Sequence, residues 1–255
     1  MPDSALNLVQ LTDCHLVDDP EGRVGDVDTF ATLEAVVDEV RRGAPAPDAV
    51  LVTGDLSQDG MLGSYWRIKT LLQRLAAPAY CLPGNHDENE PFAAALPGDG
   101  IHLTRALRRD GWQVVFLDST VAGEEDGALS EAELAALDEA LGATPELHAL
   151  VTLHHPPVAV GGAWLDQVSL ANPDDLFAVL DRHAQVRGVL FGHVHQAFEG
   201  MRNGVRLMAS PSTCFQFVRD GDGLGIGDDP PGYRRLALRP DGAIESAVHW
   251  LAGGV

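Results

Sequence analysis

Cysteine is scarce in this sequence, and its few positions exclude one class of protein. Cys14, Cys81 and Cys214 are far apart, odd in number and form no C-x-x-C pair. Such a set cannot supply the disulfide framework that supports many small secreted proteins. The opening segment MPDSALNLVQ also lacks the basic start and long apolar run of a secretion signal. Together these features predict a cytoplasmic protein with reduced thiols.

Positive charge is also scarce. The chain has 17 Lys and Arg against 38 Asp and Glu, which gives a formal net charge of -21. This charge repels nucleic acid polymers and anionic membrane surfaces, and no stretch is apolar enough to span a bilayer. A small anion is repelled less, because salt screens the general field over about 8 Å. A small molecule is therefore the expected partner.

The remaining composition is that of a globular protein. Hydrophobic residues make up 45% of the 255 residues, enough for a large core without disulfides. The sequence has no internal repeat, linker or low-complexity tail. We therefore expect one domain over residues 1–255.

Short apolar runs alternate with amphipathic stretches and predict an α/β fold. Ser130 followed by Glu133 indicates a capping box at one helix start. Asn203-Gly204 and Pro240-Asp241-Gly242 predict two hairpin turns, so the chain should end in antiparallel strands. The expected helices span 28–40, 64–75, 130–141 and 174–182. The expected strands span 6–12, 49–53, 79–82, 113–117, 149–153, 186–191, 196–201, 205–209, 233–238 and 244–250.

The segment from Asp220 to Gly232 is rich in Gly, Asp and Pro and is typical of a mobile surface loop. A calcium loop is the alternative, but its twelfth position holds Pro231 where Glu is required.

Five polar blocks follow predicted strands, where open α/β sheets commonly form their sites. The blocks are Asp13-Cys14-His15, Gly54-Asp55, Gly84-Asn85-His86-Asp87, His154-His155 and Gly192-His193-Val194-His195. Residues two apart on an extended segment share a face, so each D-x-H or H-x-H pair can converge on one point. Carboxylate, imidazole and amide ligands without thiolate favour manganese, iron, zinc or cobalt. Each block alone is also compatible with a turn, but five together predict a metal site.

These five blocks resemble the calcineurin-like metallophosphoesterases, whose pattern is D-x-H, G-D, G-N-H-(D/E), H and G-H-x-H. The similarity extends to the bacterial class III cyclic nucleotide phosphodiesterases through residues 27–29, 117–119, 127–130, 203–205 and 210–217. It covers nearly the whole chain. The resemblance implies a four-layer αββα sandwich, in which helices flank two mixed β-sheets and the metals lie at one edge.

The resemblance also implies a role for each matching residue. One metal would take Asp13, His15 and His195, the other Asn85, His154 and His193, and Asp55 would bridge both. The implied cofactors are two ions such as Mn²⁺, Fe²⁺ or Fe³⁺, with Zn²⁺ or Co²⁺ as alternatives. A hydroxide shared by the ions would attack phosphorus, and His86 would protonate the leaving group. Asn85, His86 and His195 would contact the substrate.

The implied substrate is 3′,5′-cyclic AMP or a related cyclic nucleotide, which would be hydrolysed to the 5′-monophosphate. Three alternatives stay open: a broader diesterase acting on small diesters such as glycerophosphodiesters, a phosphatase, and a binding protein without turnover. A homodimer is also open, because related enzymes are often oligomeric.

Several neighbours of the blocks have two interpretations. Asp87 either orients an imidazole or caps a turn, and His155 either joins the outer shell or only packs. Phe215 and Phe217 would share one strand face, where core packing is favoured over stacking on a base. Cys14 is expected to be a small packed side chain. The histidines assigned to structure are His102, His148, His183 and His249.

Overall fold

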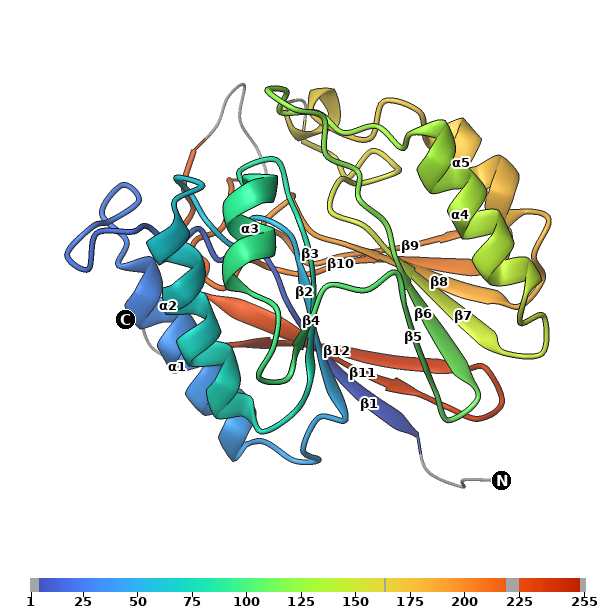
Figure 1. Cartoon of the computed structure of the whole chain (residues 1–255), viewed down its shortest axis with the longest axis horizontal. Helices are drawn as coiled ribbons and strands as arrows, with labels where there is room; N and C mark the ends of the chain where they lie inside the picture. The colour runs from blue at the N-terminus through green and yellow to red at the C-terminus, as the bar shows by residue number, and fades with distance from the viewer. Residues whose placement is uncertain (1–4, 163, 219–224, 253–255) are drawn as a thin grey trace.

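Two six-stranded mixed β-sheets pack face to face in the computed structural model, with helices on both outer sides (Figure 1). The structure describes residues 5–162, 164–218 and 225–252. The first sheet has the order β12-β11-β1-β2-β3-β4 and the second β5-β6-β7-β8-β10-β9. The expected αββα sandwich of two mixed sheets is therefore confirmed.

The strands of the first sheet are β1 (Leu6–Leu11), β2 (Ala49–Thr53), β3 (Ala79–Leu82), β4 (Ile101–His102), β11 (Gly232–Leu238) and β12 (Ile244–Trp250). Those of the second sheet are β5 (Ala106–Arg109), β6 (Trp112–Phe116), β7 (His148–Thr152), β8 (Val186–Phe191), β9 (Phe198–Arg202) and β10 (Val205–Ala209). β1, β2 and β3 run parallel, as do β6, β7 and β8.

Helices cover the outer face of each sheet (Figure 1). On the first sheet lie α1 (Thr29–Arg42), α2 (Leu62–Leu72) with the short η1 (Gln73–Leu75), and α3 (Asn89–Ala95). On the second lie α4 (Glu131–Gly142) and α5 (Pro173–Leu180), and the 3₁₀ turn η2 (Leu165–Gln167) precedes α5. Among the described residues, no helix combines the length and apolarity needed to cross a membrane.

The central strands are buried on both faces. Leu8 and Leu51 of the first sheet pack against Leu150 and Leu190 of the second, while helices cover the opposite faces. This double burial explains why the sequence of β2, AVLVT, is a continuous apolar run rather than an alternating one. Cys14, which follows β1, is buried in the core between the first sheet and its helices, as expected of a small packed side chain. Burial raises the pKa of its thiol to about 12, so the thiol is unreactive.

Most expected elements form within two residues of their predicted ends, and both terminal hairpins are present. Ser130 accepts the Glu133 N–H at 3.1 Å, which confirms the helix start. The Glu133 carboxylate, however, accepts the Asp118 N–H and pairs with Arg105 at 2.6 Å, so it joins α4 to a loop. The sequence interpretation missed α3, β4 and β5. These elements are short, and β5 carries two exposed arginines.

Part of the expected surface loop 220–232 is paired rather than free. Residues 220–224 lie outside the described part of the chain. Beyond them, Val218 N–H donates to Gly225 O and Gly227 N–H to Gln216 O, both at 2.8 Å. A short two-stranded stem therefore holds Phe217 opposite Ile226.

Candidate metal centre

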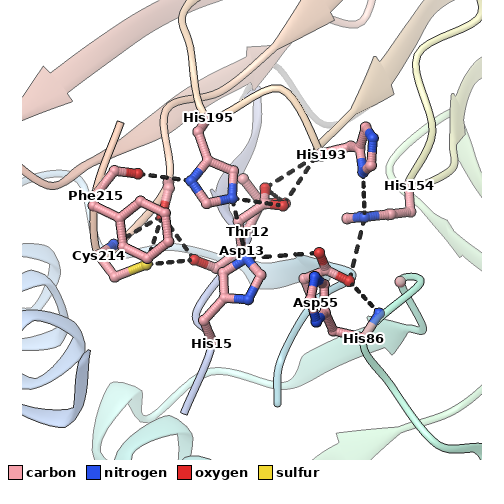
Figure 2. A network of polar contacts seen from close by, with 12 residues as sticks. Thr12, Asp13, His15, Asp55, His86, His154, His193, His195, Cys214 and Phe215 are labelled. Carbon is pink, nitrogen blue, oxygen red and sulfur yellow. Dashed lines mark hydrogen bonds and ion pairs between the residues drawn. The ribbon is translucent and has the colours of Figure 1, made fainter. Parts of the chain in front are cut away.

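The candidate ligands gather where parallel strands of both sheets end (Figure 2). β1 leads to Asp13 and His15, and β2 leads to Asp55. The second sheet contributes His154 after β7, with His193 and His195 after β8. Asn85 and His86 come from the turn after β3. All seven predicted ligands are therefore brought together, from strands more than 100 residues apart in sequence.

The local geometry differs from the expected one. Asp13, His15, His193 and His195 lie beyond their strands, with φ between +47° and +69°. They are therefore not extended pairs that share one strand face, and that explanation for their convergence was wrong. Left-handed conformations cost non-glycine residues on the order of 1 kcal/mol each, and such strain clusters at functional sites. Backbone bonds offset it: Asp13 N–H donates to Gly54 O at 3.0 Å.

One group of ligand atoms surrounds His15. Its Nε2 lies 3.0 Å from Nε2 of His195 and 3.6 Å from Oδ2 of Asp55. Asp13 Oδ1 lies 3.5 Å from the same His195 nitrogen. All four side chains are at most 3% exposed, so solvent does not satisfy these atoms.

A second group surrounds His154. Its Nε2 lies 3.1 Å from Oδ1 of Asn85 and 3.2 Å from Nδ1 of His193, and the latter two atoms are 3.1 Å apart. Asp55 Oδ1 lies 3.4 Å from His154 Nε2. The two oxygens of Asp55 therefore face different groups, which is the arrangement required of a bridging carboxylate.

The spacing fits two cations. Ligand atoms about 2.0–2.2 Å from one ion lie roughly 3–3.5 Å from each other, as they do here. The histidine tautomers also fit, because a carbonyl can only accept. His195 Nδ1–H donates to Phe215 O at 2.7 Å and His154 Nδ1–H to Thr53 O at 2.9 Å. In its neutral form each ring therefore turns an unprotonated Nε2 to the centre, as metal ligation requires.

The protein environment sets the charges of these groups. Burial lowers the pKa of His15 and of His193 to about 3, so both are neutral. Burial alone would raise the pKa of Asp55, but the charge of His154 and its hydrogen bond bring it well below the usual range. Burial likewise opposes protonation of His154, yet Asp55 raises its pKa to about 9. A bound cation would displace this proton, since metal ligation requires neutral imidazole.

His86 lies beside the ligand groups but has a different environment. It is partly exposed, and a ring nitrogen lies within 4.8 Å of ligand atoms of His15 and Asp55. Its backbone N–H donates to Asp55 Oδ1 at 3.0 Å. Its Nδ1 lies 3.2 Å from the Gln58 amide nitrogen, which can only donate. Nδ1 is therefore the acceptor, and Nε2 carries the proton of the neutral ring.

The structure separates the interpretations of two neighbours. Asp87 accepts the backbone N–H groups of Leu56, Ser57 and Gly84 at 2.9–3.1 Å, so it ties two loops together and does not orient an imidazole. His155 is fully buried, with its Nδ1 2.8 Å from Ser119 Oγ and its ring 4.9 Å from that of His193. A ring nitrogen of His155 also lies within 4.8 Å of ligand atoms of His154 and His193, so the residue belongs to the surroundings of the second ligand group and is not a remote packing residue.

The block 210–217 supports the centre in a way the sequence did not indicate. Ser212 Oγ donates to Asp13 O at 2.7 Å and holds the turn of that ligand. Phe215 and Phe217 do not lie on a strand, so the shared-face explanation was wrong. Phe215 is 8% exposed and stacks on His15, and Phe217 stacks on His195 at 4.1 Å between ring centroids.

A cavity of about 450 Å³ opens onto the ligand groups. Asn85, His86 and His195 line it, as expected of residues that contact substrate. The far wall consists of Trp164, Val168 and other apolar side chains that the sequence interpretation did not single out. The volume and position of the cavity suit a small organic molecule.

Residues 6–197 match the family model described as calcineurin-like phosphoesterase. The chain belongs to this family. It is 42% identical to the 3′,5′-cyclic adenosine monophosphate phosphodiesterase CpdA of Pseudomonas aeruginosa, over 96% of this chain and 90% of that protein. It is 38% identical to a 3′,5′-cyclic-nucleotide phosphodiesterase of a Nostoc species, over 95% of this chain and 91% of that protein.

The fold is also shared with solved structures. A dimetal phosphatase from Danio rerio superposes with a TM-score of 0.66 at 15% identity, covering 98% of this chain and all of that one. At this identity the similarity concerns the fold alone.

Proposed function

We propose that this protein hydrolyses 3′,5′-cyclic AMP to the 5′-monophosphate with the help of two metal ions. The observation that carries the proposal is similarity over nearly the full length to relatives named as cyclic nucleotide phosphodiesterases. The shared carboxylate of Asp55 between two ligand groups, beside a cavity of nucleotide size, supports it. Cyclic AMP also meets the electrostatic requirement of a small anion.

The residues of the centre would hold the ions as follows. Asp13, His15 and His195 form one ligand set, and Asn85, His154 and His193 form the other. When bound, two cations supply an ionised water as nucleophile and offset charge on the phosphoryl oxygens. Asp55 fixes the separation of the two sets, because each of its oxygens faces one of them.

His86 stabilises the leaving group. As the bond from phosphorus to the 3′-oxygen breaks, the Nε2–H of His86 donates a hydrogen bond to that oxygen and stabilises its developing negative charge, while water supplies the proton that the oxygen takes up. Gln58 keeps the proton on Nε2 by donating to Nδ1. The partial exposure of His86 allows water to reach the leaving oxygen.

The donor set supports manganese, iron, zinc or cobalt as the metals. We further propose that the protein acts as a single domain in the cytoplasm, in keeping with its three free, buried cysteines. Homodimer formation is a separate proposal that gel filtration with light scattering tests directly.

Steady-state hydrolysis of cyclic AMP, measured after reconstitution with manganese, tests the function. Bis(p-nitrophenyl) phosphate serves as the reference diester and a glycerophosphodiester as the competing substrate class. Efficient cleavage of cyclic AMP is the expected result. Cleavage of the reference diester alone would retain the metal centre and reject the cyclic nucleotide.

A further inference from the structure

The cavity beside the metal centre has two chemically different walls. Its inner wall consists of the ligand groups and His86. Its outer wall, which we call the apolar shelf, is formed by Val24, Trp164, Val168, Phe217 and Ile226. These five residues come from three separate loop segments, and the metal chemistry uses none of them.

The shelf begins at a metal ligand and extends away from it. The Phe217 ring stacks on His195 with centroids 4.1 Å apart and an interplanar angle of 22°. The Trp164 ring meets Phe217 edge-on at 5.7 Å. A molecule whose phosphate lies between the ligand groups would therefore extend its remaining part along these two rings.

The shelf is held in place, yet it is open to a ligand. Trp164 and Phe217 are partly buried and pack against the core of the second sheet, and the short stem pairs Phe217 with Ile226. Ile226, by contrast, is 51% exposed, an unusual position for a large apolar side chain at the mouth of a polar centre. Contact with a bound apolar surface would remove this exposure.

The charge of the wall restricts the ligand further. None of the described residues that line the cavity is Lys or Arg, and Glu125 is the one carboxylate outside the ligand groups. The part of the substrate beyond the reacting phosphate therefore meets no positive charge. It must therefore carry no second negative charge and be large enough to cover the aromatic surface.

We propose that the apolar shelf is the subsite that binds the nucleobase, and that Trp164 and Ile226 determine the preference for nucleotide esters over diesters without a ring. The inference rests on the proposed function. Base stacking on an aromatic side chain is sequence-tolerant, because every base has a π-face. The shelf thus favours a planar heterocycle over a small polar group such as glycerol.

Two ligands that differ only in the base test the proposal: 5′-AMP and ribose 5-phosphate. Their inhibition constants are measured on the manganese-loaded enzyme with bis(p-nitrophenyl) phosphate as substrate, and titration calorimetry of the same ligands gives binding without turnover. We expect wild-type protein to bind 5′-AMP at least about tenfold more tightly, since loss of one stacking contact weakens binding by about 5- to 150-fold.

Trp164→Ala should remove most of this difference and leave the constant for ribose 5-phosphate within about twofold. Ile226→Ala is the second variant; its exposed side chain does not support the core, so the protein folds without it. Trp66→Ala is the matched control, because Trp66 is 49% exposed on α2 and does not line the cavity. The control should keep the full difference.

Equal binding of the two ligands by wild-type protein would overturn the proposal, as would equal weakening of both ligands by Trp164→Ala. These results are separable from failure of the proposed function. Hydrolysis of cyclic AMP without a preference for 5′-AMP rejects the subsite alone. A preference that depends on Trp164, without hydrolysis of cyclic AMP, retains the subsite and rejects the function.

Discussion

The two walls of the cavity are built in different ways. In the inner wall, which we call the ligand wall, six of the seven candidate ligands are at most 6% exposed, among them Asp13, His15 and His193, and turns that directly follow buried strands place them. The apolar shelf consists of loop residues that are partly or largely exposed, such as Trp164 and Ile226. Rigid strand ends suit chemistry that depends on distances of about 3 Å, whereas a loop wall can change without moving the ligands.

This comparison implies a division of kinetic effects. Substitutions in the ligand wall should lower kcat, because they remove groups that act in the transition state. Substitutions in the shelf should raise KM and leave kcat nearly unchanged, because they remove binding common to ground and transition states. The following variants test that division from the largest expected effect to the smallest.

Asp55→Ala should lower kcat/KM by more than about a thousandfold, since both ligand groups share its carboxylate and each loses a ligand. Metal content by atomic absorption should fall from two ions toward none. Asp55→Asn is the matched control for packing, because its amide oxygen can still accept the backbone N–H of His86. A fully active, metal-loaded Asp55→Ala protein would contradict the bridging role.

His86→Ala should retain both metals and lower kcat for cyclic AMP by about 10²- to 10³-fold, the range for loss of one hydrogen-bond donor to a developing oxyanion. The loss should be smaller for bis(p-nitrophenyl) phosphate, because nitrophenolate is a stable anion that needs less stabilisation. Parallel assays of the two substrates measure the difference. A variant protein without metals would show that His86 is a ligand instead.

Gln58→Leu should reproduce this substrate-dependent loss at a smaller size, about twofold to tenfold, since it removes one hydrogen bond to the His86 ring. The double variant with His86→Ala should be no slower than His86→Ala alone. Gln58→Glu keeps a polar side chain of the same length but has no N–H to donate to His86 Nδ1, so it should lose activity as Gln58→Leu does. An additive double variant would mean that Gln58 acts independently of His86.

Val168→Ala should give the smallest effect, a rise of about twofold to tenfold in KM for cyclic AMP at constant kcat. Val121→Ala is the control, because Val121 is 37% exposed and is not part of the cavity lining. A fall in kcat for Val168→Ala, with KM unchanged, would contradict the expected separation of kinetic effects between the ligand wall and the apolar shelf.

Much of the ligand wall could be predicted from the sequence. Asp13, Asp55 and His154 each follow an apolar run, and parallel strands deliver their ends to one edge of the fold. The residue types restrict the chemistry to metal ligation, because few other roles require carboxylate, amide and imidazole groups together. What the spacing could not indicate was the left-handed conformation of five ligands, since φ depends on the surrounding packing.

The apolar shelf could not be predicted, for a physical reason. Trp164 and Phe217 lie in irregular segments, where an apolar side chain has no periodicity that distinguishes a core position from a cavity wall. The same limit applies to His155, whose place against His193 depends on contacts between two different strand ends.

The sequence by itself therefore determined the fold class, the seven candidate ligands and the negative net charge of the protein, which disfavours large anionic partners. These are properties of residue types and of their order along strands. Only the tertiary structure decided which oxygen of Asp55 faces which ligand group, which nitrogen of His86 carries its proton and where apolar loops leave a surface for a base. Those features depend on atoms that are distant in sequence, and folding alone brings them within a few ångströms.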